Sequence, residues 1–322
     1  MWKKQTLEFS LKSFLISNIY IFSAVIVVLA FYFINPSFLS LYSIQNITLE
    51  MAPLIPMALG IGFVLYTGCI DLSIGAVASA TCVITGMYIA DIGNIIILYM
   101  MLLGIAAGLI NGFLVAKLKL PSFIVTLCAQ SVWRAVAIIL SGGGSNTIPL
   151  KYRSIVNWAS ANFLHLPLMI WIALGILFIS FFIERKTELG KSIFATGANE
   201  KASRLAGVNT DKTKILAYIL CSTGAALGGV MFAYKLKSSV PTIGDNLFMM
   251  AISAVALGGT MFSGGRGSAL RTLIGVITVI SISSGMNMAG VDPMWKIVVF
   301  GLILIFAVSI NSEKSGHDLI IK

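Results

Sequence analysis

The stretch "GCIDLSIG", residues 68–75, joins two long apolar runs with almost no polar loop between them. The runs cover residues 51–67 and 72–90, each close to the length of about 20 residues that carries a helix across a membrane. An unpaired charge at mid-membrane costs about 3 kcal/mol even on the mildest scales. Asp71 therefore indicates a break between two membrane helices, where its carboxylate begins a helix or faces protein and water.

The rest of the chain is equally apolar. Of its 322 residues, 58% are hydrophobic and 11% are charged, and the mean hydropathy is +0.96, whereas a soluble domain carries roughly 25% charged residues. The long unbroken runs predict helices rather than barrel strands. We expect an all-α membrane protein, a polytopic helical bundle of about ten transmembrane helices, some short or broken, forming a single domain over residues 1–322. The expected spans are 13–34, 51–67, 72–90, 95–116, 122–141, 163–183, 214–234, 246–262, 269–289 and 294–310.

Glycines recur at every fourth position in two of the expected spans. Gly104, Gly108 and Gly112 form one such row, and Gly224 and Gly228 form another. Small residues on one face of a helix let two backbones approach closely in lipid, where no hydrophobic effect drives helices together. These rows therefore predict close helix packing.

The net charge of +10 is distributed as in a membrane protein rather than in a nucleic-acid-binding protein. With ten spans and a cytoplasmic N-terminus, sixteen basic residues fall inside and five fall outside, which supports ten spans with both termini cytoplasmic. The inside residues are Lys3, Lys4, Lys12, Lys117, Lys119, Arg185, Lys186, Lys191, Lys201, Arg204, Lys212, Lys214, Arg266, Arg271, Lys314 and Lys322. The outside residues are Lys151, Arg153, Lys235, Lys237 and Lys296.

The cysteines and histidines indicate neither disulfides nor metal sites. Each cysteine stands alone in an apolar segment, so we expect a small buried hydrophobic side chain at each. The two histidines, His165 and His317, fall at an expected outer loop and in the C-terminal tail, without neighbours at metal-ligand spacing. We therefore expect no cofactor and no metal in this chain. The cysteines are Cys69, Cys82, Cys128 and Cys221.

The longest hydrophilic stretch is the expected cytoplasmic loop 184–213. Residues 184–214 hold eleven of the 34 formal charges of the chain. Within them Asn199 is placed to cap a short helix that begins at Glu200 and that Gly207 ends. Ala202, Leu205 and Ala206 would share one face of this helix, away from Lys201 and Arg204. A helix this short is unstable alone, so it either lies on the bundle or docks a soluble subunit.

Four motifs, taken in order, resemble one family. They are "TGCIDLSIGAV" (67–77), "NGFLVAKLKLPSFIVTL" (111–127), "ATGANEKASRLAGVN" (195–209) and "AVALGGTMFSGGRGSALRTLIGV" (254–276). They look like the permease subunits of ribose-type, simple-sugar ABC importers, a family that includes galactofuranose and autoinducer-2 permeases. The resemblance covers roughly residues 40 to 310. The chain departs from the usual pattern at Cys69, commonly glycine, and at Arg271, commonly a small residue. The resemblance implies a protein of the bacterial inner membrane.

The resemblance implies a set of partners. Two permease subunits, either two copies of this chain or one copy and a related permease, would form the pathway within membrane lipid. ATPase subunits would bind below, and a periplasmic or lipid-anchored substrate-binding protein would deliver solute from above. The short helix would be the coupling helix that sits on the ATPase, with Asn199, Glu200, Lys201, Arg204, Leu205 and Gly207 as its residues. The chain has no phosphate-binding loop of its own, so a partner would bind ATP.

Several polar or aromatic residues are candidates for the pathway or its gate. Asp71 is either a capping carboxylate at the cytoplasmic end of its span or part of a broken segment near the pathway. Arg134, in the span 122–141, is either ion-paired or snorkelling for structural reasons, or lines the pathway. The other candidates are Ser73, Asn111, Phe123 and Asn287, and two weaker ones are Asn246 and Trp295.

Two other classes of function compete with the importer. A stand-alone secondary transporter driven by an ion gradient would use intramembrane acidic residues, of which the sequence offers Asp71 and, less clearly, Asp91 or Asp245. An intramembrane enzyme would need a nucleophile and base or a metal cluster, and the sequence contains neither an H-E-x-x-H motif nor a His–Asp pairing. The sequence favours the importer permease.

Overall fold

A computed structural model describes residues 18–313 of the chain. The predicted placement of both termini, with Lys3, Lys4, Lys12, Lys314 and Lys322, lies outside the described residues, and so does His317.

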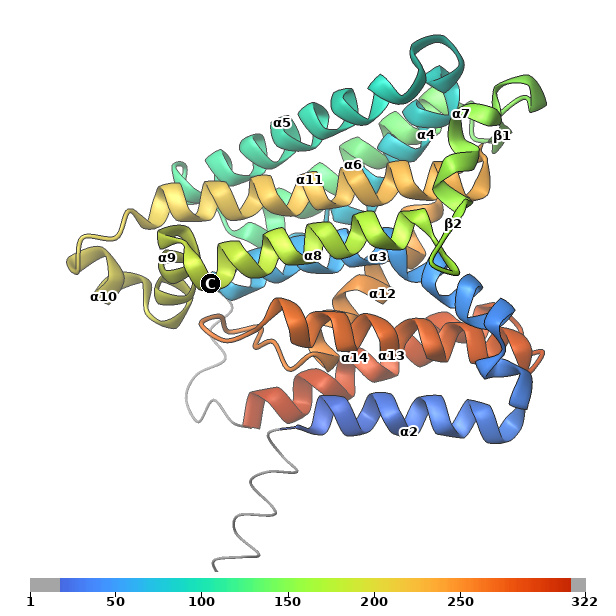
Figure 1. Cartoon of the computed structure of the whole chain (residues 1–322). Coiled ribbons are helices and arrows are strands. Elements are labelled where there is room, and N and C mark those ends of the chain that lie inside the picture. The colour runs from blue at the N-terminus through green and yellow to red at the C-terminus, as the bar shows by residue number, and fades with distance from the viewer. Residues whose placement is uncertain (1–17, 314–322) are drawn as a thin grey trace, which may run out of the picture.

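Long apolar helices run roughly side by side along the molecule (Figure 1). Each expected span overlaps one of them, which confirms an all-α polytopic membrane fold. Within residues 18–313, six helical segments are long and apolar enough to cross a membrane, and one of them covers both α4 and α5. The exact number of ten crossings stays a prediction. The helices are α2 (Ile19–Ile34), α3 (Leu41–Tyr66), α4 (Ile74–Ile92), α5 (Ile96–Ala116), α6 (Ser122–Ser141), α8 (Leu168–Lys186), α11 (Thr210–Leu236), α12 (Ile243–Leu257), α13 (Ala269–Met288) and α14 (Met294–Glu313).

Several helix ends differ from the predicted boundaries, and the structure shows the cause for three of them. Helix α3 begins ten residues before the expected 51, because Ser40 caps it by accepting a hydrogen bond from the Ser43 N–H at 3.2 Å and polar residues then continue the helix. Helix α8 begins at Leu168 rather than 163, because β2 (Asn162–Phe163) and β3 (Leu166–Pro167) form a short antiparallel hairpin before it. Helix α12 ends at Leu257, and the glycine-rich residues 258–268 form a loop instead of continuing the span to 262.

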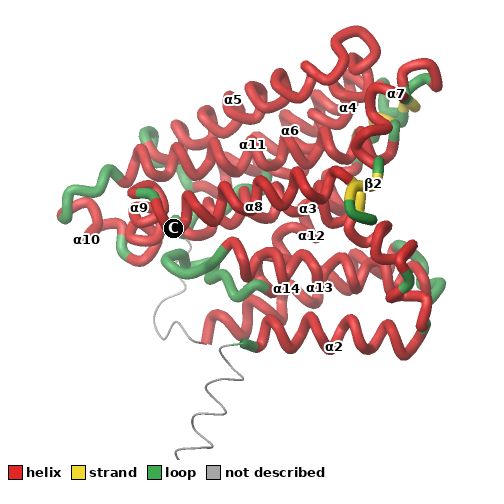
Figure 2. Tube along the Cα trace, in the orientation of Figure 1, coloured by secondary structure: helices red, strands yellow, loops and turns green. Residues whose placement is uncertain are grey.

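The two ends of the bundle carry different connections (Figure 2). At one end, called the α10 end here, lie α9 (Glu188–Ala198) and α10 (Glu200–Leu205). Toward the opposite end lie η1 (Pro36–Leu39), η2 (Gly93–Ile95), η3 (Leu150–Tyr152), α7 (Ser154–Asn157), η4 (Trp158–Ser160), and the antiparallel pair β1 (Asn146–Thr147) and β4 (Ser238–Ser239). There, Asn94 Oδ1 accepts hydrogen bonds from Trp158 Nε1 at 3.2 Å and from Tyr234 Oη at 2.9 Å. These bonds hold the α4–α5 turn against η4 and α11.

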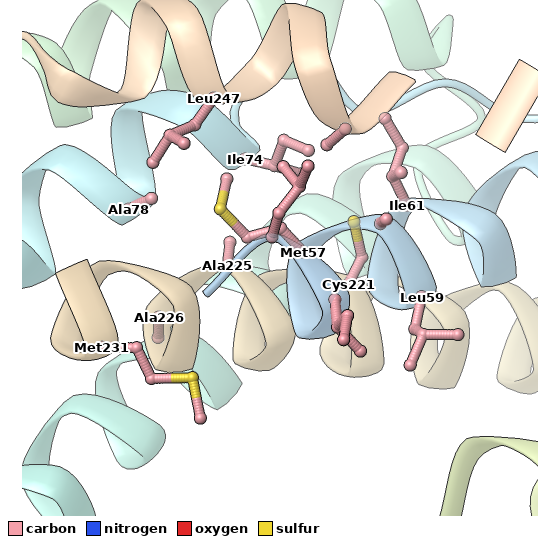
Figure 3. Close-up of a cluster of buried hydrophobic side chains, with 14 of the residues drawn as sticks. Met57, Leu59, Ile61, Ile74, Ala78, Cys221, Ala225, Ala226, Met231 and Leu247 are labelled. Atoms are coloured by element: carbon pink, nitrogen blue, oxygen red, sulfur yellow. The ribbon is translucent and has the colours of Figure 1, made fainter. Parts of the chain in front are cut away.

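Helix α11 lies at the centre and packs closely against α3, α4 and α5. A Cβ added to Gly104 of α5 would lie 2.8 Å from the Ser222 carbonyl oxygen, and one added to Gly112 would lie 2.8 Å from the Ile215 Cα. Gly224 and Gly228 on α11 are constrained in the same way, because a Cβ at either position would overlap α3. The predicted close packing of both glycine rows is confirmed. Figure 3 shows the buried core around this junction, with Met57, Ile61, Ile74, Ala78, Cys221, Ala225 and Leu247 contributed by α3, α4, α11 and α12.

The cysteines follow their helices. Cys69, Cys82 and Cys221 are buried free thiols, as predicted. Cys128 is exposed, so its predicted burial is wrong. The cause is α6, which presents most of its side chains outward and contributes few to the core.

The glycine contacts predict a steric effect of a single methyl group. We expect Gly108→Ala to lower stability by about 1–3 kcal/mol, because the new Cβ would overlap the backbone of Tyr218 and Ile219 on α11. The measurement is the apparent melting temperature of the purified protein in detergent. Gly175→Ala on α8 is the matched control, since nothing lies within 4 Å of its added Cβ and alanine favours a helix. Equal melting temperatures for the two variants would contradict the close α5–α11 contact.

Candidate functional site

The short helix α10 forms as its sequence predicts. Asn199 Oδ1 accepts a hydrogen bond from the Ala202 N–H at 3.0 Å, which satisfies a free donor of the first turn. Glu200 is the first residue of the helix, where a negative charge is favourable. Gly207 follows with φ +87°, a conformation that strongly favours glycine, and turns the chain toward α11. The predicted cap, start and end are therefore confirmed.

Charged side chains fasten α10 to the N-terminal turns of α11. Arg204 Nη2 donates to Asp211 Oδ1 at 2.9 Å, and Lys214 Nζ donates to Glu200 Oε2 at 2.8 Å. Lys119, from the α5–α6 loop, joins the network through Asp211 at 2.6 Å. The network therefore connects α10, α11 and the α5–α6 loop.

Glu200 is ionised near neutral pH, as this network requires. Partial burial raises the pKa of Glu200, but Lys214 and Arg204 outweigh burial, so the pKa lies below its ordinary value. The contribution of these ion pairs to stability is therefore present above the ordinary carboxyl pKa and is lost as the pH falls through the lowered pKa of Glu200.

The apolar face of α10 points away from the bundle. Ala202, Leu205 and Ala206 are all exposed, and Leu205 is 91% exposed. Lys201 is exposed beside them, and a hollow of about 550 Å³ runs along Glu200, Lys201, Arg204 and Leu205. Of the two interpretations of the sequence, a helix that lies on the bundle through its apolar face does not match this arrangement. The helix contacts the bundle through its polar side chains and presents its apolar face outward.

Behind α10, the end of α9 meets α3 and the loop 258–268 through backbone atoms. The Gly265 N–H donates to the Tyr66 carbonyl at 2.9 Å, and the Tyr66 ring stacks on Phe194 of α9 with centroids 4.9 Å apart. A Cβ on Gly197 would overlap the Tyr66 carbonyl oxygen. A Cβ on Gly264 would lie 2.7 Å from the Gly68 nitrogen. We call these contacts among 66–68, 194–197 and 264–265 the glycine junction.

The side chain of Glu184 connects the end of α8 to the start of α13 at the α10 end. Its Oε2 accepts a hydrogen bond from the Ala269 N–H at 2.6 Å, and its carboxylate pairs with the Arg185 Nε at 3.3 Å. The carboxylate is buried at the start of α13, where the helix dipole favours it. Sequence reasoning missed this residue, because Glu184 reads as the first polar residue of a solvated loop.

The α3–α4 break encloses three of the predicted residues. Asp71 Oδ1 accepts hydrogen bonds from the Ser73 N–H at 2.8 Å and the Ser73 hydroxyl at 2.6 Å, and Asn111 Nδ2 donates to Ser73 Oγ at 3.0 Å. All three side chains are buried. Tyr218 Oη, eight residues into α11, donates to the Ile70 carbonyl at 3.1 Å, so the break lies about 12 Å along α11 inside the bundle. The predicted capping role of Asp71 is wrong, because Ser73 is the N-cap of α4 and no side chain within residues 18–313 caps that helix; the Asp71 carboxylate instead holds the turn two residues before the N-cap. A role of Asp71 in the pathway stays a prediction.

Helices α6 and α12 place an ion pair on the surface of the bundle. Arg134 Nη2 lies 3.1 Å from Asp245 Oδ2, and the two side chains are 50% and 48% exposed. Asp245 sits in the first turn of α12, where the Gly244 N–H donates to Ser79 Oγ of α4 at 2.9 Å. Ser79 is five residues into α4, so α12 begins alongside the body of α4 and not at its end. The partner of Arg134, which the sequence left open, is Asp245.

Further polar and aromatic side chains surround this pair or lie apart from it. Phe123 is exposed on the same face of α6 as Arg134, because a separation of eleven residues is about three turns of a helix. Asn246 directly follows Asp245 and Thr242 precedes it by three residues, and both side chains are exposed. Asn287 and Trp295 are exposed near the ends of α13 and α14, and nothing within residues 18–313 joins them to Arg134. That same part of the chain holds no group of three or more His, Cys, Asp or Glu residues able to bind a metal.

The comparisons with known proteins agree on one family. Residues 43–308 match the family described as "Branched-chain amino acid transport system / permease component". The chain is 32% identical to the ribose import permease protein RbsC of Escherichia coli (strain K12), over 87% of this chain and 89% of that protein. It is 32% identical to RbsC of Bacillus subtilis (strain 168), over 88% of each, and 31% identical to the L-arabinose transport system permease protein AraH of Escherichia coli (strain K12), over 87% of this chain and 85% of that protein. No solved structure matches the chain.

The α3–α4 break predicts a stability effect at Asp71. We expect Asp71→Ala to cost about 1–3 kcal/mol, because the buried N–H and hydroxyl of Ser73 lose their acceptor. Asp71→Asn, which keeps an oxygen at that position, should lose less. The measurement is again the apparent melting temperature in detergent, with Asp91→Ala, at the exposed end of α4, as the control. A loss no larger at Asp71 than at Asp91 would refute this role.

Proposed function

This chain belongs to the branched-chain amino acid transport system permease component family, and from that premise we propose that it is the membrane-spanning subunit of an ATP-driven importer of small sugars. In this proposal it forms the pathway and hydrolyses no ATP itself. A separate ATPase subunit binds at the α10 end, and a periplasmic or lipid-anchored binding protein delivers the solute at the opposite end. The α10 end is then cytoplasmic, in a bacterial inner membrane.

The exposed apolar face of α10 is the observation that carries the ATPase part of the proposal. Leu205 on this helix of six residues is 91% exposed, so its side chain adds almost no buried apolar surface to the stability of the isolated chain. The ion pairs of Arg204 and Glu200 hold the helix in place from the opposite side. A helix fastened by its polar side chains, with its apolar face free, suits insertion into the groove of a soluble partner.

The contacts behind α10 provide a route for the motion of the ATPase. The ion pairs pass movement of α10 to α11, and the glycine junction passes movement of α9 to the end of α3 and to the loop 258–268. The same junction reaches Gly68, three residues before Asp71. We therefore propose that ATPase closure acts on the α3–α4 break and on the α12–α13 loop together.

The pair of Arg134 and Asp245 supports the pathway part of the proposal. Exposed charges within the span of a membrane helix are costly in lipid, so this face of α6 should meet water or another protein. We propose that it lines the pathway, which a second permease, another copy or a related chain, completes. An ion pair of zero net charge, with Asn246 and Thr242 beside it, offers hydrogen-bond donors and acceptors to uncharged hydroxyl groups.

The solute class follows from the names of the relatives and from this polar surface. Relatives at 31–32% identity are named as ribose and L-arabinose permeases. We propose a monosaccharide or a similar small polyol or furanosyl solute. The competing function, an ion-driven transporter that works alone, has a direct test: uptake into vesicles that hold only this chain, driven by an ion gradient, would establish it.

The first functional prediction concerns Leu205. We expect Leu205→Asp to lower copurification of the ATPase subunit and to abolish coupling between ATP hydrolysis and uptake, because a charge would replace the apolar contact. The folded protein should keep its melting temperature, since Leu205 is 91% exposed. Leu150→Asp, at a leucine that is 78% exposed in η3 near the opposite end, is the matched control for ATPase retention. Normal coupled uptake by Leu205→Asp would defeat the assignment of α10.

The second functional prediction concerns Arg134. We expect Arg134→Met to reduce uptake at least tenfold while leaving ATPase copurification unchanged, because it removes the guanidinium and leaves Asp245 unpaired. The double variant Arg134→Asp/Asp245→Arg restores the pair and tests whether pairing alone is sufficient. Uptake is measured with labelled ribose or L-arabinose at matched protein levels. Unchanged uptake by Arg134→Met would remove this pair from the pathway.

A further inference from the structure

A basic hollow lies at the α10 end between the end of α8, α9 and the start of α13. Its volume is about 590 Å³. Four cationic side chains and one carboxylate line it, and the carboxylate of Glu184 already accepts the Ala269 N–H and pairs with Arg185. The cations are Arg185, Lys191, Arg266 and Arg271. The lining therefore has a surplus of three positive charges.

Two of these cations have no partner of their own. Within residues 18–313, the side chains of Lys191 and Arg266 form no ion pair or hydrogen bond, and both are exposed. Holding like charges around one hollow is unfavourable unless an anion joins them. Neither residue belongs to the network that fastens α10, and neither lies in the polar cluster on α6 and α12. The hollow is thus separate from both surfaces described above.

The hollow lies at the level where membrane helices begin. The Arg271 guanidinium stands 5.1 Å from the ring centroid of Tyr20, in the first turn of α2. Arg271 is also the third residue of α13, and Arg185 is next to last in α8. On α8 the exposed Phe182 lies three residues before Arg185, further along the helix toward the membrane, and the exposed Leu270 adjoins Arg271 at the start of α13. The hollow thus combines positive charge at the membrane boundary with apolar helix surface beside it, and an anionic lipid has the matching headgroup and acyl chains.

We propose that this hollow binds the phosphate headgroup of an anionic phospholipid, with the acyl chains along α8 and α13. The cations pair with the phosphodiester, and the size of the hollow leaves room for the rest of the headgroup. A bound headgroup bridges α8, α9, the loop 258–268 and α13, and so braces the glycine junction from the membrane side. A zwitterionic headgroup brings its own cation and binds less well. The site requires a membrane but is independent of the solute carried.

Native mass spectrometry of the delipidated full chain tests the proposal with two probes, phosphatidylglycerol and phosphatidylcholine. We expect the wild type to retain phosphatidylglycerol preferentially. Lys191→Gln/Arg266→Gln should weaken this retention on the order of 30-fold, since each basic side chain near a membrane surface contributes about a factor of five to lipid binding. Lys186→Gln/Lys212→Gln removes two exposed cations from the same end that do not line the hollow, and should retain the lipid as the wild type does.

Three results would overturn the proposal. We call Lys191→Gln/Arg266→Gln the pocket variant and Lys186→Gln/Lys212→Gln the control variant. Equal phosphatidylglycerol retention by these two variants would show that the hollow is not the binding site. Displacement of the lipid by millimolar inorganic phosphate, with the same rise in melting temperature from phosphate alone, would assign the site to a soluble anion. Loss of ATPase copurification by the pocket variant, without selective lipid retention by the wild type, would make the hollow a protein-docking surface. A failure of uptake with intact lipid selectivity would bear on the transport function alone.

Discussion

The bundle depends on the close approach of α11 to α3, α4 and α5. Lipid supplies no hydrophobic force between helices, so dispersion contacts at short backbone separation must hold them together. Glycines make that separation available on both sides, with Gly104 and Gly112 on α5 and Gly60 on α3. Such contacts leave no room for helices to slide, so α11 and its three neighbours respond to a force as one body. The enclosed break at Asp71 and the outward helix α10 are both built on this body.

Helix α10 and helix α9 attach to that body by two different kinds of contact. Ion pairs at a partly exposed surface, such as Arg204 with Asp211, are individually weak, with about 0–1 kcal/mol each. These weak ion pairs orient α10 but do not fix it rigidly to the bundle. The glycine junction is a backbone contact with no side chain to yield at Gly197. In the proposed mechanism, movement at the α10 end therefore passes most directly through α9 to Tyr66, the α3–α4 break and the loop 258–268.

Local chemistry could be predicted from the sequence, and long-range pairing could not. The cap at Asn199 and the stop at Gly207 depend on residues a few positions apart, so their patterns are readable. The apolar runs likewise located the long helices. The partner of Arg134 depends on where α12 begins, which is set by the Gly244 contacts with Gly75 and Ser79, about 165 residues away. Glu184 escaped for the same reason, because its partner Ala269 lies 85 residues along the chain.

The bundle keeps its interior charges in two distinct ways, and the difference bears on what drives transport. Asp71 is buried, and its Oδ1 accepts two hydrogen bonds from Ser73, whereas its Oδ2 has no hydrogen-bond partner within residues 18–313. Asp245 is half-exposed but paired with Arg134, so its charge is already balanced without a bound ion. An ion-coupled carrier needs a carboxylate that a proton or cation can occupy during the cycle. Asp245, balanced by Arg134, fits the proposed permease moved by a partner at α10, whereas an ion-coupled carrier would have to use the free Oδ2 of Asp71.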